Sequence, residues 1–416
     1  MNFKKSLLAA AVGAAFCGLS QAEVVVYGLA MPFLESVESK DASPLPPAAS
    51  RPSMLAPGAY SGVEDPRRAR ITVGTSHLGF RGSEDLGGTL KVVWQMESAF
   101  QIDQNTGPGW GGRDAKVGLR DKWGEIFLGQ WDTPYKYISL PVNPLRAGYV
   151  FDRSALTGNP GMGVGNTTTQ FTRINAKPDA SFDRRQGNSV QYWSPDLAGF
   201  TARVMYSVDE GVGPVAAGGP NVKPTVFGAS VVYAVGALSL RYAYEEHKDY
   251  FGMSQIGGSA AGTATNGSSK DYGHKFVVLY RIGNTRLTGL YEILEYKNND
   301  STPNAVKSYK RNAYYGVIEQ FFGANSAQSV FISYGRSEDG SCSRVGGAAC
   351  LSNALGADYM TLGYIYRFSR RTELFFGYYQ MKNKENGSYS PGPFIALAPA
   401  VGVTIQGAGV GMYHSF

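Results

Sequence analysis

From Glu23 to the end of the chain, apolar and polar side chains alternate in segments of about ten residues. The segment 237–245 is an example, because one of its faces would carry only Leu238, Leu240, Tyr242 and Tyr244. Residues 359–368 repeat the pattern. Successive side chains of a strand point to opposite faces, so each segment predicts a strand with one face in an apolar medium and one in water.

A membrane-crossing chain must satisfy every backbone polar group internally, which only helices and closed barrels achieve. After residue 22 no stretch approaches 18 consecutive apolar residues, which excludes spanning helices. Charged residues make up 17% of the chain, below the roughly 25% of soluble proteins, and glycines number 53. We therefore expect an all-β fold in which residues 23–416 form one antiparallel transmembrane β-barrel, with no further domain.

The N-terminus predicts export. Lys4 and Lys5 precede an apolar run from Leu7 to Leu19, followed by Ser20-Gln21-Ala22. A basic start, a short apolar stretch and small residues at the end are typical of a secretory signal peptide, here residues 1–22. Lipid attachment at Cys17 is the alternative, but bulky Phe16 precedes it where such sites prefer a small residue.

Connections between the alternating segments differ in length in a regular way. Short turns are expected near residues 85–88, 122–124, 195–198, 235–236, 283–284, 323–325 and 369–371. Long polar stretches are expected at 36–69, 104–112, 133–186, 211–223, 250–270, 298–310, 339–356 and 385–402. Seven turns and eight loops join sixteen strands, and short periplasmic turns with long external loops are typical of outer-membrane barrels.

Charge argues against nucleic acid as a partner. Without Lys4 and Lys5 the chain has 37 basic and 33 acidic residues, which is a nearly balanced surface.

Several motifs give the chain a family resemblance. They are Leu78–Gly88 with Gln95-Met96-Glu97, Val117–Arg120 with Trp123-Gly124 and Leu128-Gly129, Asn188–Pro195, Ser369–Leu374 and Gly411–Phe416. In this order they resemble the trimeric general porins of β-proteobacteria, of the neisserial and Burkholderia type. One departure is Gln130, where the family usually has arginine.

The resemblance implies a sixteen-stranded barrel whose third external loop folds into the lumen. It also implies a homotrimer in the Gram-negative outer membrane that passes ions and small hydrophilic solutes. Outer-membrane lipid, lipopolysaccharide and the barrel-assembly machinery, which is thought to read the terminal Phe416, are the other expected partners. No cofactor and no metal are expected.

The loop 133–186 is the candidate for the pore constriction, because an ordinary loop in a compact barrel is far shorter. It holds seven basic residues (Lys136, Arg146, Arg153, Arg173, Lys177, Arg184, Arg185) and three acidic ones (Asp152, Asp179, Asp183). Its constriction candidates are Asp152 and Arg153, and those on the wall are Arg70, Arg81, Lys91, Lys116 and Arg120. The alternative for each is that it only solvates the lumen or lies near a turn. The basic excess predicts a mild preference for anions, which the missing arginine at Gln130 would weaken.

Cys342 and Cys350 lie in a predicted external loop of an exported protein, where a disulfide is expected and two free thiols are the alternative. No cysteine and histidine spacing suggests zinc.

Two other functions are alternatives. An outer-membrane hydrolase needs a histidine near a nucleophile. His77 and His414 fit structural positions, and no nucleophile motif lies near His247 or His274. A substrate-selective channel would share the barrel and bind one solute saturably. Tyrosines in the inward loop, such as Tyr135, Tyr137 and Tyr149, are compatible with that alternative.

Overall fold

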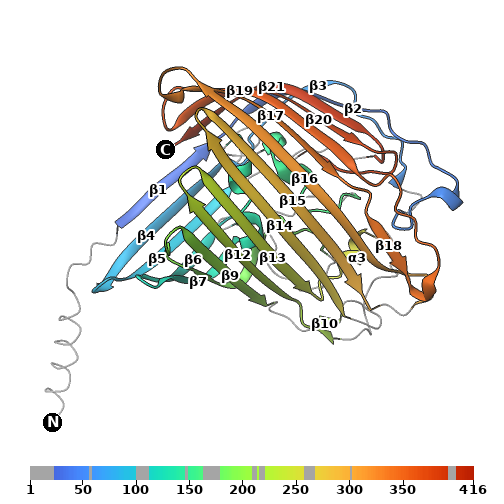
Figure 1. The fold of residues 1–416 in the computed structure, drawn as a ribbon, viewed down its shortest axis with the longest axis horizontal. Helices are drawn as coiled ribbons and strands as arrows, with labels where there is room; N and C mark the ends of the chain where they lie inside the picture. Colours follow the sequence, from blue (N-terminus) through green and yellow to red (C-terminus); the bar gives the residue numbers. More distant parts are fainter. Residues whose placement is uncertain are drawn as a thin grey trace, which may run out of the picture.

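Strands dominate the computed structural model, and they form one antiparallel sheet that closes on itself (Figure 1). The structure describes residues 23–55, 59–99, 112–145, 149–162, 179–208, 213–214, 221–256, 268–299, 302–391 and 400–416. The expected signal peptide and the loop residues Arg146, Arg173 and Lys177 lie outside these ranges.

The sheet contains 19 strand segments. Two barrel strands are split in two, and β18 belongs to a loop, which leaves the sixteen strands that the sequence predicts. The first eight barrel strands are β1 Glu23–Ala30 with β2 Phe33–Lys40, β3 Arg68–Thr72 with β4 His77–Gly87, β5 Leu90–Ala99, β6 Ala115–Asp121, β7 Gly124–Asp132, β8 Arg185–Trp193, β9 Phe200–Val208 and β12 Thr225–Val235. The other eight are β13 Leu238–Lys248, β14 Ser269–Ile282, β15 Thr285–Asn298, β16 Val306–Phe322, β17 Gln328–Ser337, β19 Ala357–Arg367, β20 Thr372–Asn383 and β21 Thr404–Ser415. The loop strands are β10 Gly213–Pro214, β11 Asn221–Val222 and β18 Ser341–Arg344.

The last strand closes the barrel against the first. Strand β21 pairs with β20 on one side, and with β2 and the end of β1 on the other. Gly28 and Phe416 exchange two backbone hydrogen bonds, each 3.1 Å long. This pairing confirms the predicted closure between the strand that starts at Glu23 and the strand that ends near Phe416.

The first strand is interrupted between β1 and β2, which the sequence analysis did not predict. Pro32 lies at the break, and proline has no N–H to give to a neighbouring strand. The backbone N–H of Met31 donates to the Ser76 hydroxyl at 2.9 Å instead. Ser76 lies in the matching break between β3 and β4. Its side chain therefore supplies a hydrogen bond where the backbone pairing of the two strands is interrupted.

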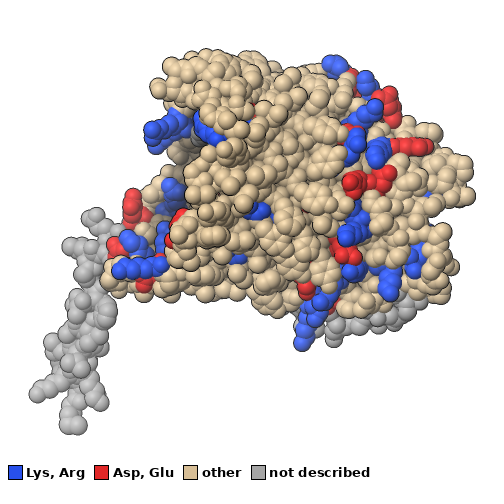
Figure 2. All heavy atoms as spheres, viewed as in Figure 1, with Lys and Arg blue, Asp and Glu red and all other residues tan. Residues whose placement is uncertain are grey.

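Alternation along the strands separates an outer face from the lumen. On β6, Val117 and Leu119 are exposed on the outer face, while Lys116, which precedes Val117, is buried on the other face. Figure 2 shows charged side chains gathered toward the two ends of one face of the molecule, with a broad, nearly uncharged belt between them. The outward sides of the strands therefore suit a lipid bilayer.

All seven predicted short turns join consecutive barrel strands, and the eight long connections occur in the predicted order. Two are shorter than predicted, because β2 continues to Lys40 and β16 already begins at Val306. The turns and both termini of the described chain lie at one end of the barrel, and the long loops lie at the other (Figure 1). Helices are short: α2 spans Pro134–Tyr137 and α3 spans Gly252–Ile256. No helix in the described ranges is both long and apolar enough to cross a membrane.

The described parts of the third long loop, within residues 133–184, turn into the barrel. Its apolar residues Ile138, Val150, Phe151 and Leu156 are all completely buried, although they belong to no strand. This confirms the inward-folded third loop that the family resemblance implies. We call this segment loop L3.

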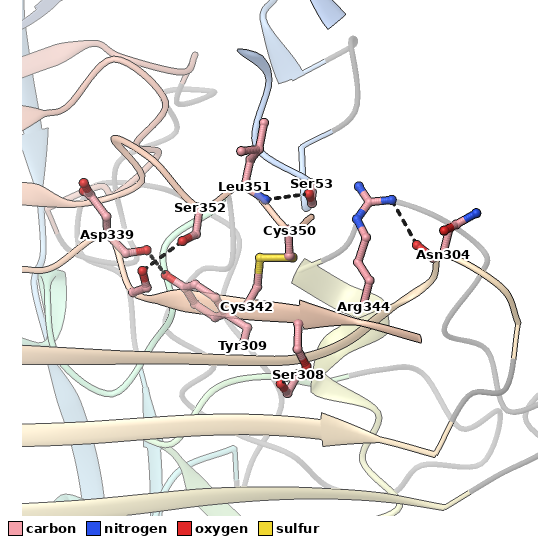
Figure 3. Close-up of a disulfide and its surroundings, with 12 residues drawn as sticks. Ser53, Asn304, Ser308, Tyr309, Asp339, Cys342, Arg344, Cys350, Leu351 and Ser352 are labelled. Atoms are coloured by element: carbon pink, nitrogen blue, oxygen red, sulfur yellow. Dashed lines mark hydrogen bonds between the residues drawn. A yellow bond between two sulfur atoms is a disulfide. The ribbon is translucent and has the colours of Figure 1, made fainter. Parts of the chain in front are cut away.

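Cys342 and Cys350 form a disulfide at the long-loop end, with their Cα atoms 5.6 Å apart, which confirms the expected pair (Figure 3). The residue after Cys350 is Leu351, whose carbonyl accepts from the backbone N–H of Ser53 at 2.8 Å. The N–H of Leu351 donates to the Ser53 hydroxyl at 2.9 Å. The disulfide loop thus holds the first long loop at the barrel mouth.

Candidate pore constriction

Loop L3 begins with a capped helical turn that directs it into the lumen. Thr133 caps α2, since its hydroxyl accepts from the backbone N–H of Lys136 at 3.2 Å, and Pro134 occupies the first helical position, which it favours. The next residue, Tyr135, is fully buried and donates its hydroxyl to Glu292 on β15 at 2.8 Å. The loop is therefore attached to the far wall within three residues of leaving β7.

Glu292 holds L3 at two places. Besides the Tyr135 hydroxyl, it accepts from the backbone N–H of Gly158 at 2.8 Å. Lys275 on β14 and Arg311 on β16 lie on either side of this carboxylate, at 3.5 Å and 3.0 Å, and all three side chains are fully buried. Arg311 also donates to the backbone carbonyls of Leu156 and Asn159 in the loop. The charged cluster of Lys275, Glu292 and Arg311 on the wall thus holds L3 at Tyr135 and again at residues 156–159.

An apolar cluster holds the middle of the loop. The ring of Phe151 lies 5.8 Å from that of Phe33 on β2 and 6.3 Å from that of Phe375 on β20, both edge to face. Phe331 and Tyr379 contact the same ring. This packing fills the side of the lumen that is lined by β2, β17 and β20.

The described charged residues of L3 pair with one another or with the base of the loop. Arg153 lies 3.1 Å from Asp183 and 3.5 Å from Asp152, and its side chain is 1% exposed. Arg184 lies 2.9 Å from Asp179, and Lys136 lies 3.0 Å from Asp132. The candidates Asp152 and Arg153 are therefore neighbours inside the loop, and most of their charge is compensated locally.

On the barrel wall, residues that are paired between adjacent strands form a row across five strands, β5 to β9. The strand register pairs Lys91 with Arg120, Arg120 with Glu125, Glu125 with Trp193, and Trp193 with Arg203. Paired residues in a sheet lie on the same face, and this is the lumen face because Val117, Leu128 and Val204 of the opposite parity are strongly exposed outside. Two of the sequence candidates, Lys91 and Arg120, belong to this row.

Lys116 and Arg120 share one carboxylate. Lys116 bonds Glu125, and the Arg120 Nη2 atom lies 2.6 Å from the other Glu125 oxygen. The ammonium of Lys116 also lies 4.3 Å from the centre of the Trp131 ring and 4.1 Å from that of Trp193. Two cations against one anion leave this part of the wall positive.

Arg203 is held by rings alone. Its guanidinium carbon lies 3.2 Å from the centre of the Tyr137 ring in L3 and 3.7 Å from that of Trp193 on β8. Its Nη1 atom is buried with no hydrogen-bond partner among the described residues. Arg241 on β13 donates to the hydroxyl of Ser239 at 3.0 Å. Within the described ranges, neither arginine forms an ion pair with a carboxylate.

The remaining candidates lie apart from the carboxylate that Lys116 and Arg120 share. Arg70 is 2.8 Å from the buried Glu35, and Arg81 lies over the ring of Tyr27 at 5.2 Å. Lys91 is 2.8 Å from Asp85 at the short-turn end, where both side chains are well exposed. The seven candidates therefore do not form one cluster, and only Lys116 and Arg120 are brought into direct contact with a shared group.

Asp114 lies just before β6, beside the base of L3. The Arg185 Nε atom donates to its carboxylate at 2.7 Å. Burial raises the pKa of Asp114 to about 6, even though Arg185 lowers it, because Asp132 and Glu97 add to the effect of burial. The base of L3 thus carries a carboxyl that titrates closer to neutrality than an ordinary aspartate.

Sequence reasoning missed Arg203, Glu292 and Arg311. Alternation places all three on the lumen face, so their orientation was predictable, but their importance depends on the path of L3. Among the described residues, no group of three or more histidine, cysteine, aspartate or glutamate side chains could hold a metal ion.

Comparisons with known proteins agree with this geometry. A model of the Gram-negative porin family matches residues 9–386. Outer membrane porin protein 32 of Delftia acidovorans is 26% identical over 419 residues, which cover 99% of this chain and 100% of that protein. Major outer membrane protein P.IB of Neisseria gonorrhoeae is 32% identical over 138 residues, or 33% of this chain and 34% of that protein. The match therefore spans about a third of the neisserial relative.

Solved structures support the fold. The anion-selective porin from Comamonas acidovorans superposes with a TM-score of 0.67 at 22% identity, covering 95% of this chain and 100% of that one. OmpT of Vibrio cholerae, folded in vitro, gives a TM-score of 0.57 at 14% identity and covers 95% of this chain and 98% of that one. At these identities the likeness concerns the barrel architecture.

Proposed function

This chain belongs to the Gram-negative porin family, and on that basis we propose that it is a general diffusion channel with a mild preference for anions. Its place is the outer membrane of a Gram-negative bacterium. Ions and small hydrophilic solutes would cross passively through the water-filled space between L3 and the wall formed by β5–β9.

The preference for anions over cations is inferred from the difference in net charge between L3 and the wall that faces it across the passage. The described charges of L3 are largely paired with each other, whereas Lys116 and Arg120 share the single carboxylate of Glu125. A residual positive wall attracts anions over a distance of about 8 Å at physiological salt. One relative is described as an anion-selective porin, which agrees with this sign.

Among the sequence candidates, we propose that Lys116 and Arg120 act directly on permeating ions. Lys91 would act at the short-turn entrance, and Arg70 and Arg81 would contribute from the wall nearer β1. Asp152 and Arg153 would act mainly by holding L3 in shape, because they are paired and Arg153 is buried.

The test is the reversal potential of planar bilayers that contain the purified protein under a salt gradient. A potential that favours anions supports the proposal. A potential that favours cations contradicts its sign, and a current that one solute blocks at micromolar concentration would support the substrate-selective alternative.

The porin family consists of channels. We propose that this chain, too, has no catalytic activity and needs no cofactor. Hydrolysis of lipid or peptide by the purified protein, lost on substitution of His247 or His274, would contradict this.

We also infer that residues 1–22 are a cleaved signal peptide, which N-terminal sequencing of the mature protein would test.

We propose a homotrimer that is assembled through the sector β1–β7. In this part of the described barrel, the strongly exposed large hydrophobic side chains on strands are aliphatic, such as Val117 and Leu128. On β8–β21 they include Tyr192, Phe200, Tyr206, Phe227, Phe276, Tyr280, Tyr291, Tyr314, Phe322, Tyr334, Tyr366 and Phe376. Aromatic side chains are favoured where a barrel meets the lipid interface, so their absence favours a protein contact.

A quenching experiment tests this arrangement. A fluorophore on Leu128→Cys should be protected from brominated lipid in the trimer, and one on Val204→Cys should be quenched. Equal quenching at both positions would exclude β1–β7 as the contact.

Lipopolysaccharide and the barrel-assembly machinery are the other proposed partners. Charged side chains gathered toward the long-loop end of one face support the first (Figure 2). On the outward side of β17 and β19, Arg336 and Asp358 lie 2.6 Å apart. The second rests on the aromatic Phe416 beside the closing strands. Pull-down of lipopolysaccharide, and the rate of insertion with and without the machinery, would test them.

A further inference from the structure

Five side chains form an alternating stack of rings and cations on the lumen side of β6–β9. Tyr137 of L3 covers Arg203, Arg203 lies on Trp193, and Lys116 lies over Trp193 and also over Trp131. A hydrogen bond from the Trp193 indole to the Gln191 side chain at 3.2 Å fixes the central ring. Rings therefore hold Arg203 in place, and none of its N–H groups has a described carboxylate partner.

This way of holding an arginine leaves its charge intact. A carboxylate partner cancels the field of a guanidinium, as Asp183 does for the buried Arg153. An aromatic ring is attracted to the cation but carries no net charge. Arg203 thus remains a full positive charge on the lumen face, with one buried Nη1 atom that has no hydrogen-bond partner in the described structure.

A second cation stands close to the first. Arg241 lies near enough to Arg203 and to Tyr137 for their charges to interact, and its only described hydrogen bond goes to the neutral Ser239 hydroxyl. The two arginines come from β9 and β13, which flank β12 on the lumen side. The carboxylates of Asp132 and Glu125 also act on the charge of Arg203, but within the described residues neither forms an ion pair with it. An anion that contacted both arginines would therefore reduce the repulsion between them.

We propose that Arg203 and Arg241 form a binding subsite for a small divalent oxyanion in the passage beside L3. The subsite rests on the proposed function, since it refines which anions the pore favours. The planar fork of a guanidinium matches two oxygens of one anion, whereas chloride offers no such geometry. A divalent anion also gains from both charges, so it should dwell longer than a monovalent one.

The experiment uses the full-length protein in planar bilayers, with chloride as the current carrier and inorganic phosphate as the probe at a pH where phosphate is mostly divalent. We expect phosphate to reduce the single-channel chloride current saturably, in the millimolar range. In Arg203→Gln the half-blocking concentration should rise about tenfold, the size expected for one charge-assisted hydrogen bond.

Three further variants separate binding from packing. Arg203→Lys keeps the charge and should retain part of the block. Arg241→Gln leaves the stack untouched and should weaken the block independently, which keeps the proposal testable if Arg203 variants fail to assemble. Lys382→Gln removes an exposed positive charge from the outer face of β20 and should change nothing.

Saturable block that persists unchanged in Arg203→Gln and in Arg241→Gln would overturn the subsite, as would a phosphate effect that never saturates. Either result could occur while the wild-type reversal potential still favours anions. In that case the proposed function stands and only the subsite fails. A wild-type preference for cations would instead count against the proposed function itself.

Discussion

The hydroxyl of Tyr135 donates a 2.8 Å hydrogen bond to Glu292, so a loop residue and a wall residue meet at a fully buried carboxylate. The same carboxylate accepts from the backbone N–H of Gly158 and is flanked by Lys275 and Arg311. One side chain therefore fixes both the entry of L3 and a point more than twenty residues further along the loop.

Replacing Glu292 by Gln should loosen L3. Removing the acid leaves two buried cations without their partner, which typically destabilises a protein by about 3 to 5 kcal/mol. We expect noisier open-channel current and a lower temperature at which the folded band disappears on gels. Glu295→Gln is the matched control, since Glu295 pairs with Lys297 in an exposed position on the same strand. Equal behaviour of the two variants would show that Glu292 does not anchor the loop.

Replacing Arg120 by Glu should shift the reversal potential toward cations. Its side chain is 54% exposed to the lumen and shares Glu125 with Lys116, so the substitution reverses the local charge without opening a cavity. Lys91→Glu should shift it less, because Lys91 lies beside Asp85 in the open water of the short-turn end. Both shifts should fade at molar salt, where the screening length is about 3 Å. A shift that is insensitive to salt would point to a structural change instead.

Acidification should strengthen the anion preference. The pKa of Asp114 is raised to about 6, chiefly by burial. Between pH 7.5 and pH 5 this carboxyl takes up a proton, which removes a negative charge from the base of L3. Reversal potentials measured over this range should therefore move toward anions, and the change should be smaller in Asp114→Asn. The same pH dependence in that variant would assign the effect to another group.

Replacing Cys342 and Cys350 by Ser should loosen the barrel mouth while the strands stay folded. Closing a loop of this size, with a sequence separation of 8, contributes about 2 to 3 kcal/mol on chain-entropy grounds. Because Leu351 also binds Ser53, the first long loop should become sensitive to protease together with the disulfide loop. Unchanged digestion at both loops would contradict this coupling.

Deleting Phe416 should lower the amount of folded trimer in the outer membrane. The deletion removes the two backbone hydrogen bonds to Gly28 and an exposed terminal ring. Phe368→Ala removes another exposed ring at the same end of the barrel without touching the closing strands, and it should assemble normally. Gels of heat-modifiable trimer report both results, and equal amounts for deletion and wild type would refute the role.

The fold was predictable because its signals are local. Alternation placed Lys116 on the lumen face between Val117 and the preceding Ala115, and the turn residues marked every hairpin. Pro32 also indicates the interruption of the first strand, since proline cannot complete a strand ladder. Its repair by Ser76 depends on a residue more than forty positions away.

The site was less predictable because its contacts are non-local. Counting charges in L3 suggested a basic loop, but the pairing of Arg153 with Asp183 depends on how the loop folds back on itself. The alternation of apolar and polar residues also cannot distinguish Arg203 from Arg311. Arg203 forms no described ion pair, whereas Arg311 shares the carboxylate of Glu292 with Lys275. Only the path of L3 brings Tyr137 onto Arg203 and separates these two cases.

The position of Trp193 between Arg203 and Lys116 makes it a natural optical probe. Indole emission responds to charges on either face of the ring. An anion that binds the neighbouring guanidinium should therefore change the intensity or the wavelength of this emission. Occupancy of the lumen could then be followed in detergent solution by ultraviolet spectroscopy, with no dye, no bilayer and no applied voltage.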